Sequence, residues 1–296
     1  MNRVPAMIIR PLDLVTAVLL LAPDVPADPG PGTARTAGLG LNPARIEVEI
    51  LPGGEKTVGF RIESPPSDAP VQGRLMLSLT DWNIDEQANV SYLDPGSLPD
   101  SACPWIVFSP AAVNISSGES QLVRITVRVP ESARPGVYRS GILVQERPPA
   151  TPPKRGEHVL YFRFRYAFTL YVIVPPVAGR GELLDVRLEE GAGGVALVCR
   201  MQNTGSRHVR PRISWSIRDG EQQPVAVLKN KESTVLLPFS TVTVRFPVAG
   251  SLPPGRYEID AQVDFNDGGS LQAARRAVLL AADGARAAAA GTVKPR

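Results

Sequence analysis

One phrase of the sequence occurs twice and decides the fold. The first copy is TVRVPESARPGVY (Thr126–Tyr138), which continues into RSGILV (139–144). The second is VTVRFPVAGSLPPGRY (Val242–Tyr257), which continues into EIDAQV (258–263). Each copy combines an alternating strand, a Pro-Gly turn and a tyrosine that opens another alternating strand. The chain therefore repeats one β-structured unit.

The two tyrosines indicate which β fold is repeated. A tyrosine at the start of such a strand can lay its ring on the core and return its hydroxyl to the backbone, as at one corner of immunoglobulin-like sandwiches. Tyr138 and Tyr257 are 119 residues apart, close to the roughly 100 residues of one sandwich. We therefore predict an all-β chain of two tandem immunoglobulin-like β-sandwich domains.

Composition agrees with a folded chain of two domains. The 296 residues leave room for two modest cores. Hydrophobic content of 43% and charged content of 21% are ordinary for a globular protein. The formal charge is only +3 and no dense basic run occurs, so nucleic acid is not an expected partner.

The N-terminus predicts export. Arg3 and Arg10 precede a short apolar run, residues 14–22, and Ala27 follows as a small residue where a signal peptidase would cut. The nine-residue run is too short to span a bilayer, which needs about 20 residues. We expect a cleaved signal peptide; an uncleaved interfacial anchor is the alternative.

Strands and boundaries follow from apolar alternation and turn residues. The predicted organisation is a signal peptide (1–27), a flexible segment (28–40), an N-terminal sandwich (41–175), a C-terminal sandwich (176–282) and a disordered tail (283–296). Predicted strands are 44–50, 57–62, 74–80, 122–129, 138–145, 184–188, 195–201, 213–217, 242–246, 257–263 and 271–280. We expect seven strands in each sandwich, and less than about a tenth of the residues in helix.

The strand predicted to close the first sandwich is unusual. It runs from His158 to Val174 behind a proline-rich loop, about twice the usual 5–6 residues of a strand. Its first face carries a large apolar residue at every second position: Leu160, Phe162, Phe164, Tyr166, Phe168, Leu170, Val172 and Val174. A core explains one such face. It leaves the aromatic and apolar residues of the second face, Tyr161, Tyr171 and Ile173, unexplained.

Catalytic and metal-binding motifs are not found in the sequence. The two histidines, His158 and His208, each lie beside a turn, and no nucleophile elbow, phosphate loop or paired-cysteine motif occurs. The segment Asp264–Gly269 lacks the spaced carboxylates of a calcium loop and reads as a hairpin turn. We therefore expect no enzyme activity, no cofactor and no metal. Cys103 and Cys199 fall in different predicted domains, so we expect two separate thiols.

Taken together, these features resemble the PapD-like periplasmic pilus (fimbrial) assembly chaperones. The resemblance is clearest over Leu41–Val174; the second domain matches in architecture and turn placement. It implies that the closing strand is lent to an incomplete pilus subunit by edge-strand addition, in which backbone hydrogen bonds give affinity and alternate side chains fill pockets. The matching row, called the apolar row below, is Leu160, Phe162 and Phe164, extended by Tyr166.

The resemblance also implies an anchor for the carboxylate at the subunit's C-terminus. Arg45 matches the family's arginine on the first strand, whereas Thr169 stands where the family has a lysine. Arg163 and Arg165 are the nearest candidates to replace that lysine, although they lie beside the apolar row. The implied partners are a pilus or surface subunit and an outer-membrane usher. No nucleic acid or small-molecule substrate is implied.

Two competing interpretations stay open at this point. Plain core packing is the alternative explanation for the apolar row. For Arg45 it is an ordinary solvated face, as is usual for an exposed arginine on a strand. The alternative function is a structural or adhesive cell-surface protein of tandem immunoglobulin-like modules. A spacer of that kind should protect its edge strand with charges or a bulge, whereas a chaperone keeps it long and apolar.

Overall fold

The computed structural model describes residues 38–66, 73–146, 164–191, 194–250, 252–269, 271–280 and 294–295. The predicted signal peptide and nearly all of the predicted flexible segment lie outside these residues. Within them, no helix is long and apolar enough to cross a membrane. The one helical element described is a single 3₁₀ turn, Cys103–Trp105, so the expected scarcity of helix is confirmed for this part of the chain.

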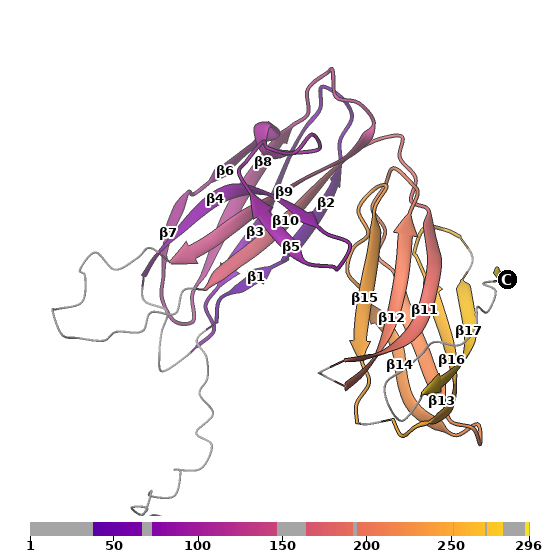
Figure 1. Cartoon of the computed structure of the whole chain (residues 1–296). Coiled ribbons are helices and arrows are strands. Elements are labelled where there is room, and N and C mark those ends of the chain that lie inside the picture. Colours follow the sequence, from indigo (N-terminus) through magenta and orange to yellow (C-terminus); the bar gives the residue numbers. More distant parts are fainter. Residues whose placement is uncertain are drawn as a thin grey trace, which may run out of the picture. The chain divides into compact units, whose positions relative to one another are not determined.

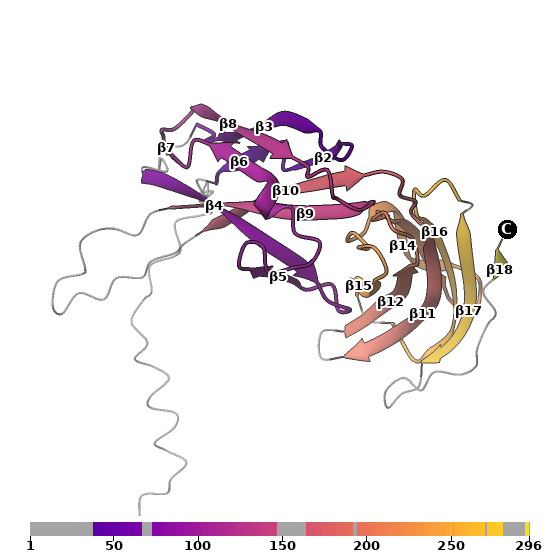
Figure 2. The same ribbon diagram turned by 90° about the horizontal axis from the view of Figure 1, so that it is seen from above.

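Two sheets face each other in the first sandwich (Figures 1 and 2). One has the order β1-β3-β8-β6, with β1 (Gly40–Asn42), β3 (Glu55–Glu63), β8 (Ser120–Arg128) and β6 (Ile106–Ser109). The other has the order β2-β10-β9-β4-β5, with β2 (Arg45–Glu49), β10 (Arg165–Val174), β9 (Gly136–Glu146), β4 (Gly73–Ile84) and β5 (Val90–Leu93), and β7 (Ala112–Ile115) also pairs with β4. The rings of Phe60 and Phe168 stack at 4.2 Å and join the two sheets.

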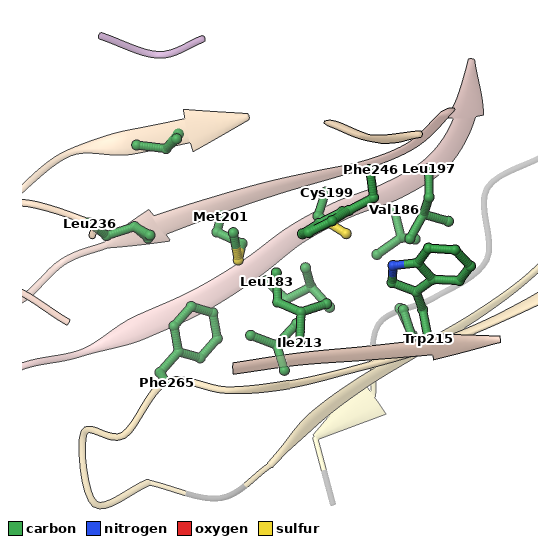
Figure 3. Close-up of a cluster of buried hydrophobic side chains, with 14 of the residues drawn as sticks. Leu183, Val186, Leu197, Cys199, Met201, Ile213, Trp215, Leu236, Phe246 and Phe265 are labelled. Atoms are coloured by element: carbon green, nitrogen blue, oxygen red, sulfur yellow. The ribbon is translucent and has the colours of Figure 1, made fainter. Parts of the chain in front are cut away.

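The second sandwich has a smaller sheet of order β11-β12-β15, with β11 (Gly181–Gly191), β12 (Gly194–Asn203) and β15 (Thr241–Pro247). Its other sheet has the order β14-β13-β16-β17-β18, with β14 (Pro224–Glu232), β13 (Arg212–Arg218), β16 (Gly255–Asp264), β17 (Gln272–Leu280) and β18 (Lys294–Pro295). Figure 3 shows part of the core between them, where Met201 and Cys199 of β12 lie near Ile213 and Phe265. Two tandem sandwiches are therefore confirmed.

Alternation along the strands explains the cores. In β8, Val123, Ile125 and Val127 are fully buried, while Arg124 and Arg128 between and beyond them are exposed. Successive side chains of a strand point to opposite faces, so this pattern fixes which face meets the core. Full burial of each such side chain stabilises the fold by about 1.5–3 kcal/mol.

Both tyrosine corners form as the duplicated phrase predicts. The hydroxyl of Tyr138 donates a hydrogen bond to the carbonyl oxygen of Arg134 at 3.1 Å, and that of Tyr257 donates to the carbonyl oxygen of Pro253 at 2.7 Å. Each bond reaches back four residues, across the Pro-Gly turn. The turn is thereby closed on the strand that follows it in both sandwiches.

The expectation of seven strands in each sandwich is wrong for the first one, which has ten strand segments. The chain changes sheet between β1 and β2, and β5, β6 and β7 are too short to show a period in the sequence. In the second sandwich β11 to β17 make the expected seven strands. Of these, β14 was not predicted, because most of its side chains are exposed and no buried apolar face marks it as a strand. The expected boundary at 175/176 falls between β10 and β11, and residues 294–295 of the tail pair with β17 as β18.

Both cysteines are buried and neither forms a disulfide, as expected. Cys103 donates through its Sγ to Asp81 Oδ1 at 3.1 Å, and Asp81 also accepts from Ser101 Oγ at 2.6 Å. Burial, together with the bond to Asp81, raises the pKa of the Cys103 thiol to about 12. Burial in the second core raises the pKa of Cys199 to about 12 as well. Both groups stay protonated at neutral pH.

We expect neither thiol to react with iodoacetamide in the native protein at pH 8, because the thiolate is the nucleophile and both thiols are buried and protonated. Mass spectrometry should find no label before denaturation and two labels after unfolding in guanidinium chloride. Rapid labelling of either cysteine in the native state would contradict the burial described above.

Removal of each corner hydroxyl should lower the free energy of unfolding. Tyr257→Phe and Tyr138→Phe each delete one hydrogen bond, worth about 1 kcal/mol, with the larger loss at Tyr257, which is the more buried of the two. Tyr92→Phe is the matched control, because Tyr92 is exposed on β5 and should change stability by less than about 0.5 kcal/mol. Urea denaturation measures all three; equal effects in the three variants would remove the corners' special role.

Candidate protein-binding site

One end of β10 carries a free backbone edge. β10 pairs with β9 along its whole length, from Arg165 to Val174. On its other side it pairs with β2 in parallel, but only over Thr169–Ile173, because β2 begins at Arg45. Just before β2 the chain belongs to the opposite sheet as β1. Among the described residues, no strand therefore pairs with residues 165–168 on this side.

The apolar row runs from the core into solvent along β10. Phe168, Leu170 and Val172 are fully buried in the first core. Tyr166 is half-buried, and its hydroxyl accepts a hydrogen bond from the backbone N–H of Leu39 at 3.0 Å. Two residues earlier Phe164 is 49% exposed. The row thus leaves the core between residues 168 and 164.

The predicted strand 158–174 needs one correction. Phe164 is described and lies outside β10, which begins at Arg165. Residues 158–163, with Leu160 and Phe162 of the apolar row, lie outside the described residues. Their assignment to partner binding stays a prediction.

The second face of β10 accounts for two of the three residues that a single core left unexplained, Tyr171 and Ile173, while Tyr161 lies outside the described residues. Tyr171 and Ile173 are almost fully buried, and they belong to the cluster that contains the second sandwich's core. The ring of Trp82 meets that of Tyr171 edge-on at 5.7 Å. The C-terminal part of β10 is therefore covered on both faces, as strands inside layered folds are.

Arg45 is the first residue of β2 and lies opposite β10. Thr169 is its Cα partner across the β2–β10 pairing, so an uncharged residue stands opposite the arginine. Arg45 Nη1 lies 3.5 Å from Glu232 Oε1, and its Nε lies 4.0 Å from Glu47 Oε1. Both ion pairs are largely exposed and hold the side chain weakly.

Beside Arg45 lies a set of charged, polar and aromatic residues, called the Glu47 cluster: Glu47, Tyr171, Arg207, His208 and Arg210. His208 Nε2 lies 3.0 Å from Glu47 Oε1, and the His208 side chain is only 3% exposed. Arg210 Nε lies 3.5 Å from the same oxygen and Arg207 Nη2 lies 3.9 Å from Oε2. The imidazole stacks on the Tyr171 ring at 4.2 Å, and the Arg210 guanidinium lies over that ring at 5.2 Å.

Electrostatics of the cluster favour an ionised Glu47. The hydrogen bond from His208 lowers the pKa of Glu47 to about 2, against the opposing effect of burial and with help from the charges of His208, Arg210 and Arg45. A cavity of about 570 Å³ opens beside the cluster and is lined by Glu47 and by residues 207–210, among others. Among the described residues, Arg210 Nη2 and His208 Nδ1 are buried without a hydrogen-bond partner. The lining also includes Asp267, so charges of both signs border the cavity.

Sequence reasoning missed the Glu47 cluster. His208 was interpreted only as a residue beside a turn, and Glu47 was not singled out. Two signals pointed to it: the basic run RHVR at 207–210, and the unexplained Tyr171 on the second face of the closing strand. Neither signal identifies Glu47 as the partner, since that pairing joins residues about 160 positions apart.

No protein-family model and no curated protein sequence matches this chain. Among solved structures it is similar to the CsuC–CsuE chaperone–tip adhesion subunit complex of archaic Csu pili from Acinetobacter baumannii, with TM-score 0.43 and 16% identity. It is also similar to a chaperone–tip adhesin complex of CFA/I fimbriae (TM-score 0.41, 10% identity) and to the class 5 fimbriae chaperone CfaA (0.40, 10%). Each match covers 81% of this chain and 98% of the other. Fimbrial chaperones are thus among the solved structures to which this chain is similar.

Replacing Glu47 should destabilise the protein in a pH-dependent way. A carboxylate whose pKa falls from 4.5 to about 2 on folding stabilises the fold above about pH 4.5, and this contribution is lost as pH falls toward 2. Glu47→Gln should therefore cost about 1 kcal/mol at pH 7, since the side chain is partly screened by solvent, and should cost less at pH 3.

Urea denaturation at the two pH values measures this difference. Glu49→Gln is the matched control, because Glu49 is an exposed carboxylate on the same strand and no ion pair of Glu49 is found among the described residues. Equal losses in the two variants, or a loss in Glu47→Gln that is independent of pH, would contradict the role given to the cluster.

Proposed function

We propose that this chain is a periplasmic, non-enzymatic chaperone, a divergent member of the PapD-like type. It would hold a pilus or surface subunit in an assembly-competent state by adding a strand to that subunit's sheet. One observation carries the proposal: the apolar row leaves the core at Phe164, next to a stretch of β10, residues 165–168, that has no strand partner on one side among the described residues.

Edge-strand addition needs both the apolar row and the unpaired backbone beside it. Unpaired backbone groups provide the hydrogen bonds, and alternate side chains provide the contacts that select a partner. Exposed aromatic residues beside an open edge invite aggregation, so such an edge is retained where a partner covers it. Leu160, Phe162, Phe164 and Tyr166 are the proposed contacts.

Arg45 is the proposed anchor for a carboxylate of the captured subunit. Thr169 opposite it supplies no charge, but Arg210 approaches the same Glu47 oxygen from the second sandwich, at 3.5 Å. Two guanidinium groups therefore flank one carboxylate oxygen. A partner's carboxylate entering here would share these groups with Glu47 or displace it.

In this proposal the two sandwiches have different tasks. Residues 41–175 capture the subunit, and residues 176–282 support β10 through Tyr171 and Ile173. The signal at 1–27 delivers the chain to the periplasm, and an outer-membrane usher receives the loaded complex. Strand exchange needs no ATP and no metal.

The rival function is a structural or adhesive surface module, and one observation favours it. Arg165, the first residue of β10, is exposed, and a charge at an open edge is a device that prevents unwanted pairing. A module of this kind would bind no subunit through β10.

The test of the proposal changes the apolar row in two places. Phe162→Ser with Phe164→Ser should abolish capture of the candidate subunit, meaning a pilus-type β-sandwich protein that lacks one strand, when the two are co-expressed in a bacterial periplasm. Size-exclusion chromatography measures the complex, and urea denaturation measures stability. The double variant should lose less than about 1 kcal/mol, because Phe164 is largely exposed.

Phe168→Ser provides the matched control from the same row. Phe168 is fully buried and stacks on Phe60, so its loss should cost about 3–5 kcal/mol. A cost of that size in the double variant would show that Phe162 and Phe164 are core residues, and the surface-module function would take the proposal's place. A stable double variant that still captures the subunit would also refute it.

A further inference from the structure

A strained and exposed phenylalanine lies in the turn that leads into β15. Phe239 has φ +54° and is 72% exposed. Positive φ places the backbone in the left-handed region, where a bulky side chain is strained. Since the ring is mostly in solvent, its burial within this chain does not compensate for that strain.

Phe239 differs from the other non-glycine residues that have a positive φ. The other residues described with positive φ, glycines aside, are Ala88, Gln222, Asn230 and Asn266. They are small or polar, and asparagine is favoured in this conformation. Within the described residues Phe239 is the one aromatic residue held this way.

The conformation of the turn is imposed from the core beneath it. Asn203 is fully buried, and its side-chain amide donates to the carbonyl oxygens of Leu236, Leu237 and Arg207 at 2.8–3.2 Å. Its backbone N–H donates to the carbonyl oxygen of Ser240 at 2.8 Å. These bonds hold the chain on both sides of Phe239, so the ring is presented to solvent in a fixed place.

The turn lies at the end of the second sandwich that contacts the first. Asn203 ties it to Arg207 of the Glu47 cluster, and Thr243 of the adjoining strand donates its N–H to the carbonyl oxygen of Glu86, in the β4–β5 turn. From this end, β10 extends over ten residues, or about 33 Å. A captured domain of roughly 100 residues has a diameter of about 34 Å, which is comparable to this length.

We propose that Phe239 is a second anchor for the captured protein, inserting its ring into an apolar pocket of that partner. The inference rests on the proposed function and extends it to the second sandwich. Aromatic anchors presented by a rigid backbone are typical of binding hot spots. Membrane insertion is less suited to this turn, because a surface-bound segment combines several apolar residues with lysine or arginine, whereas Phe239 is followed by Ser240 and Thr241.

The decisive variant is Phe239→Asn, which relieves the strain and removes the ring. It should raise the melting temperature by about 2–4 °C and weaken binding of the candidate subunit at least about tenfold. Phe239→Tyr keeps the ring and should leave both values unchanged. Leu279→Asn, which removes an exposed apolar residue from β17, is the control for affinity and should bind normally. Calorimetry and titration of purified chain with subunit provide the two readouts.

Each outcome decides the matter. Lower stability in Phe239→Asn would show that the ring is packed within the chain, and normal affinity in that variant would remove the anchor while the proposed function stands. If the wild-type chain captures no subunit, the proposed function and the anchor fall together. Flotation with vesicles of phosphatidylglycerol and phosphatidylethanolamine completes the test: wild-type binding that Phe239→Asn abolishes would assign the ring to a membrane and overturn the proposal.

Discussion

One strand, β10, belongs to two hydrophobic cores at once, and much of the structure depends on this. Phe168, Leu170 and Val172 point into the first core, while Tyr171 and Ile173 join the cluster of the second. A shift of register by one residue would exchange the two sets of side chains. Because both sets are buried, the register is fixed from both sides, and so is the direction in which the apolar row leaves the core.

The same register builds the Glu47 cluster. Glu47 is the Cα partner of Tyr171 in the β2–β10 pairing, so its carboxylate lies beside the ring on which His208 stacks. The imidazole and the Arg210 guanidinium then reach one carboxylate oxygen. A charge on an otherwise ordinary edge strand thereby becomes the link between the aromatic face of β10 and the basic run of the second sandwich.

Sequence reasoning recovered the features that have a local period. The alternating strands and the two tyrosine corners are visible within about 15 residues. β5, β6 and β7 escaped because four residues show no period, and β14 because Val225 and Val227 are exposed rather than buried. The partnership of Glu47 with His208 escaped because nothing near either residue encodes it. Long-range pairing is a property of the folded register, not of either segment.

Most edge strands of this molecule are protected against pairing with another chain, whereas two exposed aromatic rings are not explained by stability. β14, an edge strand, carries Pro224, Lys229 and Lys231, and β11, another edge, is irregular between Leu183 and Asp185; proline, lysine and bulges each discourage pairing with a foreign strand. Such devices are standard where an edge has no partner. Phe164 and Phe239 depart from that rule in the same sense: each is a large ring held in solvent, and the second also strains its backbone. Natural sequences tolerate such departures chiefly where function requires them. In the proposals made above, both rings contact another protein, and that contact is what compensates for the stability they cost.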